Sequence, residues 1–270
     1  MRVLDWSPSP IHEVSYRFAG QLGRLETASL QVTRATVESL PDGLDAIVLT
    51  SDLQGREWPC KSGRAARLLG EVVAEELALL AELGTLPPAD RVGILLAGDF
   101  YAKPDLGAGR GGSGDVRVVW EAFRSRFRWV CGVAGNHDRF GTGPPDLAAF
   151  ASFAGVNYLD GGVATLDGLR VAGVGGIVGK ASRDFRRTED DYRATLNRLL
   201  LLRPGIAIVH GGPDIPGVDL RGSELVRACF LGASPTLVVC GHCHWDAPFH
   251  ALANGTQVCN VDARVVVLRT

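Results

Sequence analysis

The sequence contains no long hydrophobic run, no low-complexity tract and no internal repeat. None of its apolar segments approaches the roughly 20 residues that a membrane-spanning helix needs, so we expect no membrane association. The opening residues, MRVLDWSPSP, lack the apolar core of a secretory signal peptide. We therefore expect a protein of the reducing cytoplasm, where disulfides are rare.

Two familiar ligand-binding patterns are also missing. The six cysteines lack the C-x-x-C spacing of structural zinc sites, and the glycine-rich stretch 101–115 does not match the GxxxxGK(S/T) phosphate loop. A net charge of -2 neither indicates nor excludes nucleic acid binding. Since no linker is apparent, we expect one domain over residues 1–270, with residues 1–44 as a β-rich N-terminal extension whose packing the sequence leaves open.

What the sequence does contain is five short apolar runs, each followed by Asp, Asn or His. They are residues 46–51 before Asp52, 92–98 before Asp99, 129–134 before Gly135-Asn136-His137-Asp138, 205–209 before His210, and 236–241 before His242-Cys243-His244. Each run has the length and β-branched content of a buried parallel strand. Ligands of open α/β sheets bind outside the carboxyl ends of the strands, so five strands should deliver polar groups to one rim.

The segments around these runs complete an α/β pattern. Helical periodicity covers residues 64–83, 116–127, 147–153, 191–202 and 224–231, and strand-like alternation covers 13–18, 29–39, 163–166, 169–174, 247–252, 256–261 and 264–269. Strand–helix–strand alternation predicts parallel pairing. We therefore predict two layers of mixed β-sheet flanked by helices.

The rim combines carboxylate, amide and imidazole side chains. Its members are Asp52, Gln54, Asp99, Asn136, His137, His210, His242 and His244. This set suits manganese, iron or zinc better than a cation that prefers oxygen alone. Asp99 can bridge two metals through its two oxygens, and we expect His242 and His244 to bind one metal each. The pattern favours a hydrolytic metal centre.

In order along the chain, the blocks D-x-(H/Q), G-D, G-N-H-D, H and G-H-x-H resemble the calcineurin-like metallophosphoesterases over residues 52–244. The resemblance implies a four-layer αββα sandwich that holds two metals. One metal would be held by Asp52, Gln54, Asp99 and His244, and the other by Asp99, Asn136, His210 and His242. His137 would face the scissile phosphate and assist the leaving oxygen, and Asp138 would orient His137.

Gln54 departs from the family pattern, which usually has histidine at this position. An amide oxygen is a weaker ligand than imidazole, so we expect looser binding there and a preference for Mn²⁺, with Fe, Zn and Ni as alternatives. In a second interpretation, Gln54 does not ligate and water fills the gap. Further along the chain, Asp262 and Arg264 are predicted to pair and brace the rim.

The resemblance implies hydrolysis of phosphate esters by a hydroxide that bridges the two metals. We favour a phosphodiesterase acting on nucleic acid or nucleotides, because the arginines are spread along the chain and no basic cap domain is apparent. Two alternatives stay open: a phosphomonoesterase acting on protein or nucleotide phosphate, and a weakly active phosphoesterase-like scaffold that binds a protein partner. Specificity would lie in residues 1–40, 101–115 and 175–190, and the sequence does not indicate an oligomeric state.

Overall fold

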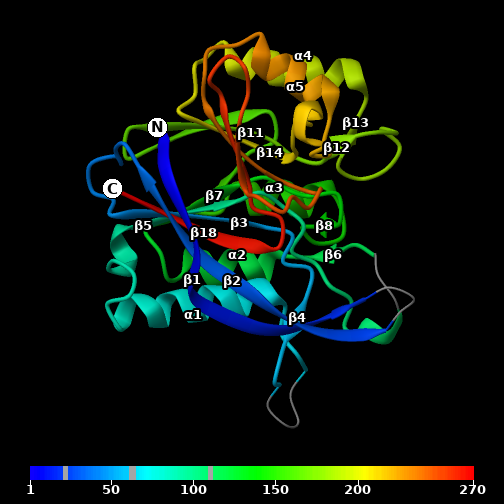
Figure 1. Ribbon diagram of the computed structural model, residues 1–270. Coiled ribbons are helices and arrows are strands. Elements are labelled where there is room, and N and C mark those ends of the chain that lie inside the picture. The colour runs from blue at the N-terminus through cyan, green and yellow to red at the C-terminus, as the bar shows by residue number, and fades with distance from the viewer. Residues whose placement is uncertain (21–23, 61–64, 109–111) are drawn as a thin grey trace.

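A computed structural model describes residues 1–20, 24–60, 65–108 and 112–270 of the chain. Figure 1 shows two sheets stacked between two pairs of helices. The helices are α1 (Leu69–Glu82), α2 (Arg117–Arg124), α3 (Pro144–Ala151), α4 (Glu189–Leu200) and α5 (Glu224–Leu231). In Figure 1, α1 and α2 cover the lower sheet, and α4 and α5 cover the upper one. The predicted αββα sandwich is confirmed.

The first sheet has eight strands in the order β4-β1-β2-β18-β3-β5-β7-β9. These are β1 (Val3–Ala19), β2 (Leu25–Val37), β3 (Ala46–Ser51), β4 (Arg56–Glu57), β5 (Val92–Leu96), β7 (Trp129–Gly132), β9 (Val156–Tyr158) and β18 (Arg264–Arg269). β3, β5, β7 and β9 are parallel, whereas β18 runs antiparallel to β3 and parallel to β2. Three of the predicted rim-forming runs therefore end at the same edge.

The second sheet has six strands in the order β10-β11-β14-β15-β17-β16. These are β10 (Gly162–Leu166), β11 (Leu169–Val174), β14 (Ile206–Gly211), β15 (Leu237–Gly241), β16 (Phe249–Ala251) and β17 (Gln257–Asn260). The inner four strands are parallel and the two edge strands are antiparallel to their neighbours. Both sheets are therefore mixed, as predicted.

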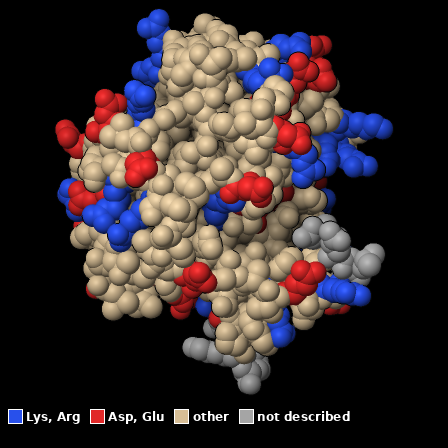
Figure 2. Space-filling view, in the orientation of Figure 1, with Lys and Arg blue, Asp and Glu red and all other residues tan. Residues whose placement is uncertain are grey.

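Short elements connect the layers. They are the two-stranded ribbons β6 (Gly114–Asp115) with β8 (Asp138–Arg139) and β12 (Ile177–Val178) with β13 (Arg186–Arg187), and the 3-10 turns η2 (Ala89–Arg91), η3 (Leu106–Ala108) and η4 (Pro216–Val218). On the face shown in Figure 2, acidic and basic side chains are interspersed. No helix within the described ranges is long and apolar enough to cross a membrane.

Alternate side chains of the central strands build the layers. Ile47 and Leu49 of β3 pack between the two sheets, while Val48 faces α1 and α2. In β14, Ile208 packs between the sheets and Val209 packs beneath α4 and α5. Successive strand residues point to opposite faces, so strands that are apolar at every position can fill two core layers at once.

The first helix starts later than its apolar periodicity predicts. The prediction placed the start at residue 64, which lies outside the described residues, and the structure places it at Leu69. The backbone just before the helix pairs with the end of β4 instead, because Glu57 N–H donates to Arg67 O and Leu69 N–H donates to Gly55 O. The helix then begins where the Glu71 carboxylate accepts the N–H of Leu68.

The N-terminal residues form a long hairpin at the edge of the first sheet. β2 pairs with β18 over residues 32–36, and β1 pairs with β2 along most of its length. Because β2 is parallel to β18 and β18 is antiparallel to β3, the tip of the hairpin lies at the end of the sheet where β3 delivers Asp52. The hairpin therefore reaches the predicted rim.

Candidate metal centre

The predicted rim residues surround one cavity of about 650 Å³. Six of them line it: Asp52, Gln54, Asp99, His137, His242 and His244. Asn136, Asp138 and His210 lie behind this lining and are buried. The ends of strands from both sheets therefore meet at one place, as the positions of these residues in the sequence predict.

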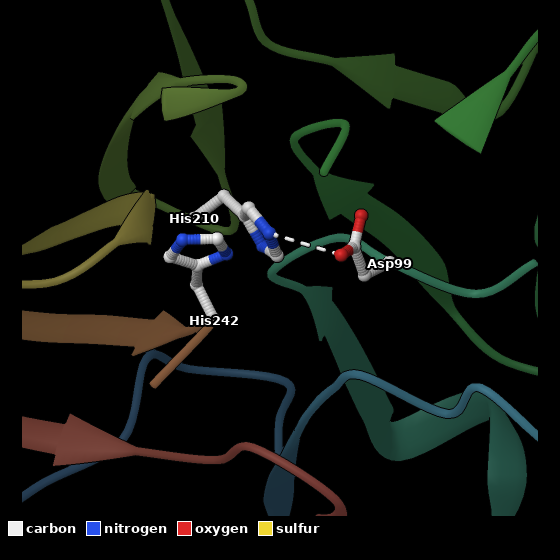
Figure 3. Close-up of side chains that lie close together, drawn as sticks. All are labelled: Asp99, His210 and His242. Carbon is white, nitrogen blue, oxygen red and sulfur yellow. Dashed lines mark ion pairs between the residues drawn. The ribbon is translucent and has the colours of Figure 1, made fainter. Parts of the chain in front are cut away.

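Asp99, His210 and His242 form the tightest group of ligand-type side chains. One ligand atom from each lies within 4.8 Å of the others, which is close enough to share a metal ion. His210 Nε2 is 3.4 Å from Asp99 Oδ2, and the rings of His210 and His242 lie side by side with centroids 5.1 Å apart (Figure 3). The three residues follow β5, end β14 and follow β15, so both sheets contribute.

Two buried atoms beside this group suit a cation. His210 donates from Nδ1 to the backbone oxygen of Ala97 at 2.8 Å, which leaves Nε2 as the ring atom that faces the Asp99 carboxylate. Within the described part of the chain, neither that Nε2 nor the buried Oδ1 of Asn136 has a hydrogen-bond partner. Buried polar atoms rarely stay unpaired, and a divalent metal would satisfy both. The residues therefore fit a metal at this position.

The same residues shift one another's protonation. Burial disfavours the charged form of His210, but the carboxylates of Asp99 and Asp52 outweigh this effect and raise its pKa to about 10. Burial and the nearby His210 lower the pKa of His242 to about 4. Burial raises the pKa of Asp52 well above its ordinary value, whereas His210 overcomes burial and lowers that of Asp99. A metal cation would take the place of the His210 proton.

The backbone around the ligands is tightly constrained. Asp52, Asp99 and His242 all adopt left-handed conformations, with φ of 54°, 59° and 69°. Such conformations are unfavourable for residues with side chains and gather at functional sites. A Cβ atom on Gly135 would overlap the Asp99 carboxylate, and one on Gly241 would overlap that of Asp52. The glycines in G-N-H-D and G-H-x-H therefore make room for the predicted ligands.

The predicted second position is more open. Gln54 is exposed and donates from Nε2 to Asp99 Oδ2 at 3.1 Å. Asp52 Oδ2 accepts hydrogen bonds from the Ser51 hydroxyl at 2.5 Å and from the backbone N–H of His242 at 2.9 Å. His244 has its Nδ1 3.2 Å from Asp262 Oδ1. Asp52 and His244 do not join the tight group formed by Asp99, His210 and His242.

The predicted pairing of Asp262 with Arg264 does not occur among the ion pairs of the described chain. Asp262 faces His244 instead, and Arg264 donates from Nη2 to the backbone oxygen of Trp245 at 2.7 Å. The same Nη2 lies 3.4 Å from His244 Nε2. Both residues therefore brace the rim through the 244–245 segment, because that segment lies between them.

His137 and Asp138 are arranged differently from the predicted orienting pair. His137 lines the cavity, and its ring Nδ1 lies 3.0 Å from Gly112 O. The backbone N–H of His137 donates to Asp99 Oδ1 at 2.8 Å. The Asp138 carboxylate instead accepts the backbone N–H groups of Asp99, Phe100 and Gly135, at 2.8 to 2.9 Å. Asp138 therefore fixes the backbone that carries the ligands, and Gly112 O orients the His137 ring.

The sequence interpretation missed an aromatic side of this cavity, which includes Tyr16, Phe18 and Tyr101. Tyr16 and Phe18 alternate with Arg17, and this alternation predicts a strand but not which cavity its rings line. Arg110, a cation in the glycine-rich stretch, lies outside the described residues. The 175–190 segment lines a separate cavity of about 670 Å³, where Arg187 pairs with Asp160 and Asp191.

Several solved structures resemble this fold. One is TT1561 of Thermus thermophilus, with 19% identity and a TM-score of 0.58, and the alignment covers 82% of this chain and 90% of that one. A hypothetical protein of the same organism has 16% identity and a TM-score of 0.46, over 80% of this chain and 75% of that one. The sulfate thiohydrolase SoxB of Thermus thermophilus, in complex with glycerol, has 12% identity and a TM-score of 0.45, over 86% and 58%.

At these identities the structural likeness concerns the fold. No curated protein is significantly similar to this chain. The family described as calcineurin-like phosphoesterase matches it over residues 46–246, a range that contains every rim residue.

Proposed function

Because the chain belongs to the calcineurin-like phosphoesterase family, whose members are metal-dependent phosphoester hydrolases, we propose that it cleaves phosphodiesters of nucleic acid or nucleotide type at two divalent metals. The observation that carries this proposal is the convergence of two buried ligand atoms, His210 Nε2 and Asn136 Oδ1, beside Asp99 and His242; Asn136 Oδ1 has no hydrogen-bond partner among the described residues. A purely structural rim would leave Asn136 Oδ1 unsatisfied at a cost of about 1–3 kcal/mol, and His210 would keep a buried proton beside Asp99.

Each metal position draws on a different part of the rim. Asp99, Asn136, His210 and His242 would hold one metal, and Asp52, Gln54, Asp99 and His244 would hold the other. When bound, divalent metals of this kind lower the pKa of water and neutralise charge on a phosphoryl group. The mixture of carboxylate, amide and imidazole ligands favours Mn²⁺, with Fe, Zn and Ni as alternatives.

His137 would act on the substrate and not on the metals. Because its Nδ1 faces the carbonyl oxygen of Gly112, Nδ1 carries a proton and Nε2 is the atom available to the substrate. The ring lines the cavity beside Asp99, where a protonated Nε2 can give its proton to the departing oxygen. Asp138 would act as a positioning residue, through the backbone N–H groups of Asp99 and Gly135.

The cavity favours a diester over a monoester. Of its described lining residues, Lys103 is the only lysine or arginine. A phosphomonoester dianion is usually bound by several cations, often by paired arginine contacts. A diester carries a single negative charge, and a cavity of about 650 Å³ has room for a second organic group.

Turnover of bis-p-nitrophenyl phosphate and of p-nitrophenyl phosphate tests this proposal. With Mn²⁺, we expect the diester to be hydrolysed with the higher kcat/KM, and metal-stripped protein to be inactive. A preference for the monoester would move the function to a phosphomonoesterase. Absence of both activities in protein that binds metal stoichiometrically would contradict the proposal.

Two variants separate metal binding from proton transfer. Asp99→Asn keeps the shape of the side chain but removes the charge shared by both metals, so metal content and activity should fall together, activity by at least about 10³-fold. His137→Ala should retain the metals and lower kcat by about 10²–10⁴-fold, the usual contribution of a general acid. Metal analysis alongside kinetics distinguishes them, and full activity in either variant would refute its assigned role.

A further inference from the structure

The cavity has two chemically different walls. One wall is the polar rim, and the other is formed by Tyr16 and Phe18 at the hairpin tip and by Tyr101 and Leu106 after β5. The end of β1 contacts η3, and Figure 1 shows the hairpin tip beside this turn. Two segments far apart in the sequence therefore line one cavity together with the predicted ligands.

The aromatic side chains of this wall are held in place by backbone. Tyr16 and Phe18 are two residues apart on β1 and share one face, with ring centroids 5.7 Å apart and planes tilted by 39°. A Cβ on Gly55 would overlap the Tyr16 ring, and one on Gly114 would overlap the Tyr101 ring. Glycine at these positions lets both rings lie against the chain, which limits their movement.

The wall is adjacent to the place where a phosphate would bind. Gly55, which supports Tyr16, directly follows Gln54, and Tyr101 comes two residues after Asp99. Tyr16, Phe18 and Tyr101 are half-buried, so each still presents part of its ring. Flat, partly exposed rings that are fixed by their surroundings make a stacking surface at little entropic cost.

We propose that this wall binds the nucleobase of a nucleoside whose sugar is esterified to the phosphate. The inference rests on the proposed phosphodiesterase function and adds the substrate class. Stacking against aromatic side chains is how proteins bind bases without reading their edges. One nucleoside on the phosphate is enough to occupy this wall, because Tyr16, Phe18 and Tyr101 line the same cavity as the predicted ligands.

Two substrates with the same leaving group test the wall. We expect thymidine 5′-(p-nitrophenyl phosphate) to have a kcat/KM at least about tenfold above that of methyl p-nitrophenyl phosphate, because stacking of one base on an aromatic side chain strengthens binding by about this factor or more. Both reactions release p-nitrophenol, so the ratio isolates the group that stays on phosphorus. Equal kcat/KM values would overturn this inference and leave the phosphodiesterase function standing.

A matched pair of variants assigns the effect to the wall. Phe18→Leu keeps apolar bulk but removes the ring, and should lower the ratio of the two kcat/KM values by about tenfold, mainly through KM for the thymidine ester. Phe153→Leu makes the same change at an exposed phenylalanine that does not line the cavity, and should leave the ratio unchanged. A wild-type ratio in Phe18→Leu would contradict the proposal.

Binding provides a readout that does not depend on turnover. By calorimetry on Mn²⁺-loaded protein, thymidine 5′-monophosphate should bind at least about tenfold more tightly than methyl phosphate, and Phe18→Leu should remove most of that difference. If neither ester is cleaved but this difference is present, the phosphodiesterase function fails while the aromatic site stands. Equal binding of the two phosphates would overturn the aromatic site.

Discussion

Asp99, Asn136 and His210 have exposed fractions of 2%, 7% and 0%, whereas the His244 side chain is 54% exposed and Gln54 lies on the surface. The first three residues belong to the buried half of the candidate centre, the last two to its open half. In the buried half, the Asn136 and His210 ligand atoms lack hydrogen-bond partners within the described residues. In the open half, Gln54 and His244 already have polar neighbours.

The two halves of the centre should therefore bind metal differently. A metal entering the buried half replaces the His210 proton that faces Asp99, and Asn136 Oδ1 has no hydrogen bond to give up among the described residues. A metal entering the open half has to displace the Gln54 contact to Asp99 and the Arg264 contact to His244. We therefore expect the buried half to retain its metal and the open half to exchange it.

Removing one histidine from each half, in separate variants, should have the largest effect on metal content. His210→Ala should weaken metal binding by more than about 100-fold, so that dialysed protein retains almost no metal. His244→Ala should retain about one metal per chain, as the wild type does, because it leaves the buried half intact. Metal analysis after dialysis checks both variants. Equal losses would show that the halves are not distinct.

The pH dependence of metal binding should report the buried half. Since the pKa of His210 is raised to about 10, its proton is bound at neutral pH and must leave when the metal enters. Affinity should therefore rise with pH, by about tenfold per unit between roughly pH 6 and pH 9. His242 adds nothing in this range, because its pKa is about 4. A flat profile in calorimetric titrations would contradict this assignment.

Substitutions at Gln54 test how the open half of the centre binds its metal. Gln54→His introduces the stronger imidazole ligand and should tighten binding of the second metal by about tenfold, with the first unchanged. Gln54→Ala separates the two interpretations of the native residue. It should weaken the second metal if the amide oxygen ligates, and leave it unchanged if water fills the position. Calorimetric titration of the second metal measures both variants.

Much of the fold and the centre could be predicted from local pattern. Apolar strands such as residues 46–51 and 92–96 are buried on both faces, so their continuous hydrophobicity marks them as central strands. Each ligand follows its strand directly, so chain order and sheet geometry together predict the rim. The helix over residues 69–82 was recognised by its period, but its start was not, because pairing with β4 competes for its first residues.

Which residues lie at the rim, and which chemistry their side chains offer, could be predicted from the order of residues along the chain. The contacts that these residues make depend on how the chain packs. Asp138 fixes the Asp99 backbone, Asp262 faces His244, and Tyr16 lines the cavity. The physical reason is distance along the chain. Periodicity constrains neighbours within one element, whereas contacts between elements depend on how sheets, hairpin and loops pack, and no local pattern encodes that packing.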